Sequence, residues 1–221
     1  MSTPIRHSFD EQLAALQQDA VRMGSPAADA VQKAVDALAQ RNLELADQVM
    51  QIENQKDALN LDIESRATQL LALQQPMARD LRTIAGVLRI ITDIERIGDY
   101  AVDTSRQARV LADRPLFKPL VDIPRMAHLV QKMLYDSLTA FVHRDLDLAM
   151  QAVHQDDEVD HACRSLHDEL VEYIQSDTSL TAQAISLLLI GVYLERMADH
   201  VTNIGERIWY METGELKELH E

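Results

Sequence analysis

Pairs of acidic residues four positions apart occur at matching places on four stretches of this chain. They are Glu53 with Asp57, Glu95 with Asp99, Asp156 with Asp160, and Glu195 with Asp199. A spacing of four places both side chains of a pair on one face of a helix. Asp103 extends the second pair by another four residues. The pattern predicts rows of carboxylates that can bind a cation.

Clustered carboxylates need a counterion. Two of them about 5.5 Å apart repel by roughly 3 kcal/mol at an effective dielectric near 20, so four would raise one another's pKa. Oxygen ligands suit magnesium, manganese, calcium or iron, whereas structural zinc prefers Cys and His. His161 and His200, each beside a motif aspartate, would favour iron or zinc. A solvated acidic face, paired with arginines such as Arg96 and Arg196, is the alternative that the pattern leaves open.

The acid pairs lie in a chain that repeats itself. Residues 94–99 return as residues 194–199, with Glu, Arg and Asp in the same register and apolar or small residues between them. A second echo relates residues 37–46 to residues 140–149. The sequence therefore indicates an internal duplication.

The elements that position the acids are predicted to be helices, because Gly, Pro and aromatic residues are scarce and Ala, Leu, Gln and Glu are plentiful. Helical periodicity runs from Phe9 to Leu111. We expect a bend at residues 24–26, a helix capped by Asn42, and a third helix starting at Pro76. Ile90, Ile94, Ile97 and Ala101 form the expected buried stripe of the third helix, as Leu194, Met197 and Val201 do in the last one.

The second half repeats this plan after a proline-containing linker. We expect a helix over residues 125–143, a cap at Asp145 followed by a helix to about Gln175, and a last helix capped by Asp177 or Thr178. The predicted fold is all-α, with two tandem three-helix antiparallel, spectrin-like bundles related by duplication and pseudo-twofold symmetry. The predicted repeats are residues 1–112 and 125–221, joined by the linker 113–124.

Charge and composition exclude several classes of function. The formal net charge of −15 argues against nucleic acid and suits cations or basic protein patches. Cys163 is the single cysteine, and no apolar signal region follows Met1, so a cytoplasmic location is expected. The longest apolar run, residues 184–194, is about half of a membrane span, which predicts a core helix and contact with membranes only through protein partners.

Catalytic motifs are scarce. Glu158 and His161 form a single Glu-x-x-His, whereas ferritin-like di-iron bundles use two. No Gly-rich phosphate loop, nucleophile elbow or paired cysteine motif is present. The sequence predicts a protein that is not an enzyme, with a metal-dependent enzyme of ferritin-like or phosphoesterase type as the alternative.

Four segments together resemble the PhoU family of bacterial phosphate regulators: residues 94–99, 194–204, 75–82 and 210–214. The resemblance covers the whole chain and implies a homodimer without catalytic activity. It also implies negative regulation of the phosphate regulon, by linking a Pst-type phosphate transporter to a PhoR-type sensor kinase. A PhoU-like regulator of a different transporter is the alternative.

The resemblance also implies multinuclear sites for iron, zinc, manganese or magnesium at the acid motifs. The predicted metal ligands are Glu53, Asp57, Glu95, Asp99, Asp103, Asp156, Asp160, Glu195, Asp199 and His200. Two departures from the family pattern distinguish the halves. Tyr100 stands where family members often have the histidine matching His200, and Asn203 stands opposite Asp103. We therefore expect the two metal sites to differ.

Overall fold

A computed structural model describes residues 4–219, and within this range it contains helices and no strand. The first half consists of α1 (Pro4–Gln40), α2 (Leu43–Gln74) and α3 (Arg79–Leu111). As predicted, Asn42 caps α2, because its side chain accepts a hydrogen bond of 3.0 Å from the backbone N–H of Glu44. The prediction for the third helix was three residues early, since positive φ angles at Gln75 and Ala78 turn the chain before α3 begins.

The second half contains α4 (Asp122–His143), α5 (Leu146–His154), α6 (Asp156–Ser176), the short 3-10 helix η1 (Thr178–Leu180) and α7 (Thr181–Thr213). Asp145 caps α5 through the N–H of Leu148, as expected. Asp177 caps η1, through the N–H of Ser179, and η1 leads into α7. The division into repeats 1–112 and 125–221 stays a prediction, and its outermost residues, 1–3 and 220–221, lie outside the described range.

The single helix expected between Asp145 and about Gln175 is interrupted. The N–H of Gln155 bonds back to the carbonyl of Ala152, and a new helix, α6, starts at Asp156. Three consecutive acids, residues 156–158, form the first turn of α6. Carboxylates are favourable at the positive end of a helix dipole, which explains why the chain restarts a helix there. At Pro26, by contrast, α1 continues without interruption.

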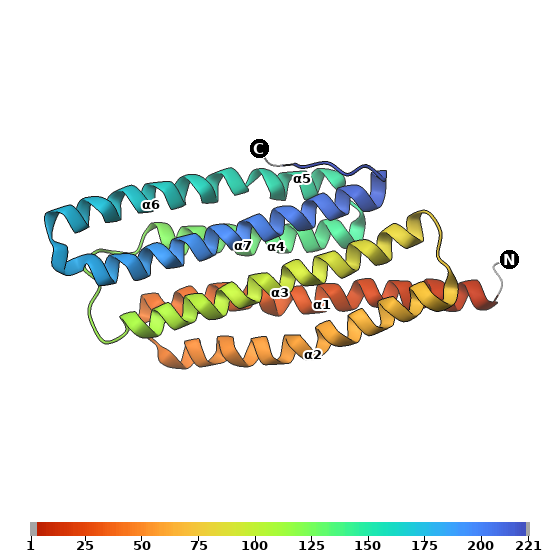
Figure 1. The fold of residues 1–221 in the computed structure, drawn as a ribbon, viewed down its shortest axis with the longest axis horizontal. Coiled ribbons are helices and arrows are strands. Elements are labelled where there is room, and N and C mark those ends of the chain that lie inside the picture. The colour runs from red at the N-terminus through yellow and green to blue at the C-terminus, as the bar shows by residue number, and fades with distance from the viewer. Residues whose placement is uncertain (1–3, 220–221) are drawn as a thin grey trace.

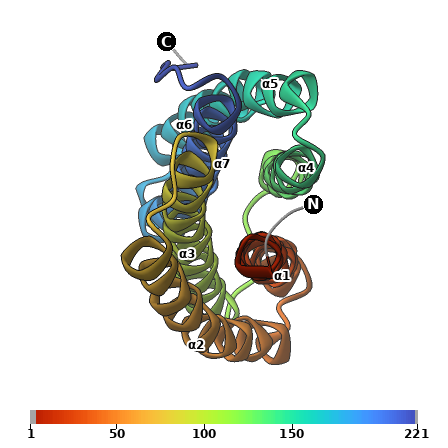
Figure 2. The same ribbon diagram turned by 90° about the vertical axis from the view of Figure 1, so that its right-hand side faces the viewer.

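Each half forms an antiparallel bundle, and the two bundles pack side by side with their ends staggered, so that α1 and α2 extend beyond the second bundle at one end and α6 and α7 beyond the first at the other (Figure 1). The contacts between halves run from α3 to α7 and from α1 to α4. Viewed along the bundle axis, α1 and α4 lie on one side of α3 and α7, with α2 and α6 at opposite ends of the row (Figure 2). The predicted all-α fold of two tandem bundles is confirmed.

One hydrophobic core extends through both bundles. Ile90, Ile94 and Ile97 of α3 are fully buried, as are Leu194 and Met197 of α7, which confirms the predicted stripes. By length and composition alone, the segment Thr178–Thr213 could also cross a membrane. The same property is common in core helices, and the buried residues of this segment pack into the shared core.

Candidate functional site

The first carboxylate cluster (Glu53, Asp57, Glu95 and Asp99) lies where α2 packs against α3. A groove of about 420 Å³ brings together Glu53, Asp99 and Asp103, with Arg96 and Arg106 among the other lining residues. Glu53 is the most enclosed of these three acids, whereas Asp57 is exposed. The structure therefore gathers most of the predicted acids of the first half along one groove.

A buried lysine enters this cluster, and sequence reasoning missed it. The Nζ atom of Lys56 lies 2.7 Å from Oε1 of Glu53 and donates a hydrogen bond of 2.8 Å to the backbone carbonyl of Glu95. Only 1% of the Lys56 side chain is exposed. The first cluster thus contains its own cation. The available signal was the spacing of three between Glu53 and Lys56, which places both on one helix face.

Gly98 provides the space that this ammonium group occupies. A Cβ atom at position 98 would collide with Oε2 of Glu53 and with Nζ of Lys56. Next to this contact, Nδ2 of Asn60 donates a hydrogen bond of 2.9 Å to Oε2 of Glu95. Side chains of α2 therefore pair with both glutamates of the first cluster, Lys56 with Glu53 within α2 and Asn60 with Glu95 across to α3.

The acidity of Glu53 reflects this enclosure. Burial raises the pKa of the Glu53 carboxyl above its ordinary value, and the hydrogen bond and charge of Lys56 oppose that shift. The negative charges of Asp99 and Asp57 raise the pKa further. The negative charges of both neighbouring acids thus act on Glu53, and the positive charge of Lys56 opposes their effect on its pKa.

The second carboxylate cluster (Asp156, Asp160, Glu195 and Asp199) lies where α6 packs against α7. Its cationic partners among the described residues are arginines near the surface. Arg196 lies 3.4 Å from Glu195 and 3.2 Å from Asp199, and Arg164 lies 3.4 Å from Asp160. More than half of each arginine side chain is exposed. These pairs are of the exposed kind that contributes little and rearranges readily.

The second cluster has no counterpart of the buried lysine. Position 56 of α2 corresponds to position 159 of α6, which is a fully buried valine. Position 98 of α3 corresponds to position 198 of α7, which is alanine. The duplicated acids are thus retained, while Lys56 and the glycine that makes room for it are replaced by Val159 and Ala198.

Burial and mutual repulsion perturb the second cluster as well. Burial raises the pKa of Glu195, Asp199 raises it further, Arg196 lowers it in part, and Asp160 adds to the increase. Burial followed by the charges of Glu195 and Asp160 also raises the pKa of the Cys163 thiol. The negative charges gathered between α6 and α7 therefore act on both Glu195 and Cys163.

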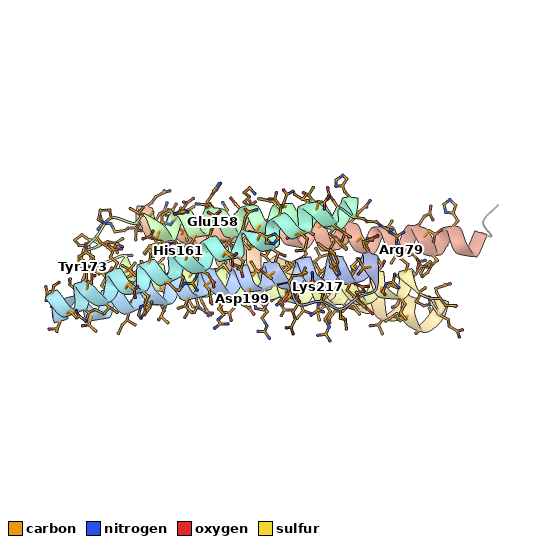
Figure 3. The ribbon with its side chains drawn as sticks, turned by 90° about the horizontal axis from the view of Figure 1, so that it is seen from above. Arg79, Glu158, His161, Tyr173, Asp199 and Lys217 are labelled. Carbon is orange, nitrogen blue, oxygen red and sulfur yellow. The ribbon has the colours of Figure 1, made fainter. Side chains whose placement is uncertain are left out.

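The other predicted residues belong to neither cluster, although Asp103 lines the groove beside the first one. His200 Nδ1 lies 2.9 Å from Oδ1 of Asp93, so this histidine joins α7 to α3. Asn203 donates to the same oxygen at 3.3 Å. Asp103 pairs with Arg106 at 2.6 Å. His161 is exposed on α6, on the same helix as Glu158, whereas Asp199 belongs to α7 (Figure 3).

The two clusters differ in the cations that already pair with their carboxylates. Between residues 4 and 219, no three His, Cys, Asp or Glu side chains are placed so that they could hold a metal together. In the first cluster, the ammonium group of Lys56 stands at the carboxylate where an ion would bind, so the residues do not fit. In the second cluster, the arginines that pair with Asp160, Glu195 and Asp199 are mostly exposed, so they occupy no enclosed position among the carboxylates. Such oxygen ligands suit iron, manganese or magnesium.

The fold and these clusters define a class: tandem helical bundles that carry one acidic cluster in each repeat. The chain belongs to the PhoU family, because the family model for the PhoU domain matches residues 20–108 and 123–208. The chain is 37% identical over 209 residues to a relative from Caulobacter vibrioides and 35% identical over 206 residues to one from Aquifex aeolicus. The alignments cover 94% and 93% of this chain, and 91% and 93% of the relatives. Both relatives are named phosphate-specific transport system accessory protein PhoU homolog.

Solved structures show the same similarity. PhoU from Pseudomonas aeruginosa has 31% sequence identity and a TM-score of 0.90, over 94% of this chain and 100% of that one. The phosphate transport system regulatory protein PhoU from Streptococcus pneumoniae has 28% identity and a TM-score of 0.86, over 95% and 99%. The resemblance to the PhoU family is thereby confirmed along both repeats.

Proposed function

We propose that this protein is an accessory regulator of phosphate-specific transport that acts by protein contact rather than by catalysis. The observation that carries the proposal is the end-to-end match with relatives named for that role, including both repeats. The alternative of a ferritin-like enzyme finds no support in the placement of its motif. Glu158 pairs with Arg125 at 3.3 Å, on a surface where His161 is also exposed.

The proposed partners are a Pst-type phosphate transporter and a PhoR-type sensor kinase. A strongly acidic surface attracts basic patches on other proteins and speeds their encounter. In this proposal the protein works in the cytoplasm as a homodimer and reaches the membrane through the transporter. It keeps the phosphate regulon off while phosphate is plentiful.

The second carboxylate cluster is the proposed metal site, and iron, zinc, manganese or magnesium is the proposed ion. The negative charges of Asp160 and Asp199 act on Glu195, and the arginines that pair with these acids are mostly exposed. A bound cation would relieve that repulsion and draw α6 and α7 together. The metal would thus fix the shape and charge of this face for a partner.

Complementation tests the proposal in a strain that lacks the gene. Phosphate uptake and a phosphate-repressed reporter are measured in phosphate-rich medium. The wild-type gene is expected to restore repression, and Glu195→Gln with Asp199→Asn is expected to lose it. Asp168→Asn with Glu172→Gln is the matched control, because these exposed acids have the same spacing on α6 outside the cluster. A deletion strain that still represses the reporter would refute the regulatory role. Full repression by the folded Glu195 and Asp199 variant would refute the role of the cluster.

A further inference from the structure

We propose that Lys56 is a built-in counterion that keeps the first carboxylate cluster free of metal, so that metal binding is confined to the second cluster. The second part of this statement rests on the proposed function, whereas the first part does not. The inference assigns Lys56 and Gly98 a joint role in deciding which repeat accepts an ion.

Lys56 stands at the carboxylate where a metal would have to bind. The Nζ atom of Lys56 lies 2.7 Å from Oε1 of Glu53. A metal on that carboxylate would bind at about 2.0–2.6 Å from its oxygens, depending on the ion. Such an ion would stand directly beside the positive charge of a lysine whose side chain is 1% exposed, so water would screen their repulsion only in part. The ammonium group and a metal are therefore alternatives at this carboxylate.

Burial and a second hydrogen bond hold Lys56 in this position. The side chain of Lys56 is 1% exposed, and its ammonium group also donates to the carbonyl of Glu95. Moving it out would leave that carbonyl without this donor and expose the packed stem of the side chain. Arg164 and Arg196 in the second cluster are mostly exposed and can turn into water. A metal can displace those arginines, whereas Lys56 is fixed.

Lys56 and Gly98 are both replaced in the second repeat. A Cβ at position 98 would collide with the ends of both the Lys56 and the Glu53 side chains, so the observed position of this ion pair depends on a glycine on the facing helix. The equivalent positions of the second repeat carry Val159 and Ala198, which leave no room and no charge. The two differences form one unit, in which a cation and its space are both present or both absent.

The test starts from purified full-length protein from which a chelator has removed metal. This protein is titrated with Mn²⁺, and electron paramagnetic resonance measures the concentration of free ion at each step. Asp99→Asn reports on the first cluster and Asp199→Asn on the second, and the two substitutions are matched because Arg96 and Arg196 pair with these aspartates in the same way. In the wild-type background, Asp99→Asn should leave Mn²⁺ binding unchanged and Asp199→Asn should abolish it.

Replacing the lysine should open the first cluster. Lys56→Met is expected to create Mn²⁺ binding that is at least tenfold tighter than any residual binding there, and Asp99→Asn in the same chain should remove it. Circular dichroism checks the fold. If Lys56→Met does not fold, Lys56→Gln serves as the second variant. The reverse transplant, Val159→Lys with Ala198→Gly, should abolish binding at the second cluster.

The possible results separate the role of Lys56 from the metal function of the second cluster. A loss of wild-type Mn²⁺ binding on Asp99→Asn would overturn the inference, because the first cluster would then bind metal despite Lys56. A folded Lys56→Met or Lys56→Gln protein with no new site sensitive to Asp99→Asn would also overturn it. If the wild type binds no Mn²⁺ but Lys56→Met gains a site, the proposed metal function of the second cluster fails and the role of Lys56 stands.

Discussion

The two carboxylate clusters occupy equivalent places in the two repeats but neutralise their charge in different ways. Lys56 enters the first cluster from within the helix pair and is shielded from water. The second cluster relies on Arg164 and Arg196, which approach from the surface. Retention of an acid motif therefore does not imply retention of its chemistry, since the counterion decides whether a cation from solution is needed.

The interface between the repeats shows the same divergence. Asp93 and His200 form a polar pair across α3 and α7. At the related position, Tyr193 and Tyr100 stack with ring centroids 5.9 Å apart. A pseudo-twofold axis thus relates a hydrogen-bonded pair to an aromatic pair, and the molecule is symmetric in its backbone more than in its chemistry.

The largest expected effect comes from removing the internal counterion. Lys56→Met should destabilise the metal-free protein by roughly 3 kcal/mol, at the low end for breaking a buried ion pair because Glu53 keeps some exposure. Calorimetry should then show a fall in Tm of roughly 6–12 °C for a protein of this size. Lys132→Met is the control, since Lys132 pairs with Asp136 at the surface. It should cost about 0.5 kcal/mol or less. Equal losses for the two variants would contradict a special role for Lys56.

The next effect tests whether Lys56 and Gly98 act as one unit. Gly98→Ala should cost about 1 kcal/mol, because overpacking against Glu53 and Lys56 exceeds the gain in helix propensity. In the Lys56→Met background the same substitution should instead stabilise by up to about 1 kcal/mol. Urea unfolding of the four proteins measures this coupling. Identical effects of Gly98→Ala in both backgrounds would show that the two positions are independent.

The helical architecture could be predicted from the sequence because it rests on long, regular patterns. The repeated register of residues 94–99 and 194–199 and the apolar stripe of α3 indicated two related bundles, which the structure contains. The break at Gln155 was missed, since periodicity continues across it. It follows from the helix-terminal preference of the acids at 156–158, a local effect that outweighed the pattern.

The counterion could not be predicted in the same way. Lys56 stands beside Asp57 in a polar stretch, where lysine is ordinarily exposed. Its burial depends on how closely α2 approaches α3 at Gly98, which is a matter of packing rather than of pattern. The pairing of His200 with Asp93 likewise depends on the contact between the repeats. Within the sequence, the signals were the spacing of three between Glu53 and Lys56 and the replacement of Lys56 and Gly98 by Val159 and Ala198 in the second repeat.

A smaller effect is expected at the interface between the repeats. Asp93→Ala removes the acceptor shared by His200 and Asn203, at a site where both partners are partly buried, and should cost roughly 1 kcal/mol. Tyr193→Leu removes the stacking of the related aromatic pair and should cost about 0.5–1 kcal/mol. Urea unfolding of both variants compares the two pairs. A much larger loss for Tyr193→Leu would mean that the aromatic pair, rather than the polar one, dominates this interface.

The smallest expected effect is at Glu195, where a neutralising substitution should change Tm with the opposite sign to its counterpart in the first cluster. Burial, with Asp199 as the next cause, raises the pKa of Glu195 in the folded protein. A carboxyl with a raised folded pKa contributes stability that is present below its unfolded pKa and is lost as the pH rises through the folded pKa. In the metal-free protein, Glu195→Gln should therefore raise Tm by about 1–2 °C at pH 7, relative to its effect at pH 4.

Glu53→Gln should instead lower Tm at pH 7, although burial raises the pKa of Glu53 too, because the charge of Lys56 would lose its partner. Differential scanning calorimetry at both pH values measures the two signs. The same sign for both variants at pH 7 would mean that Lys56 does not set the two clusters apart.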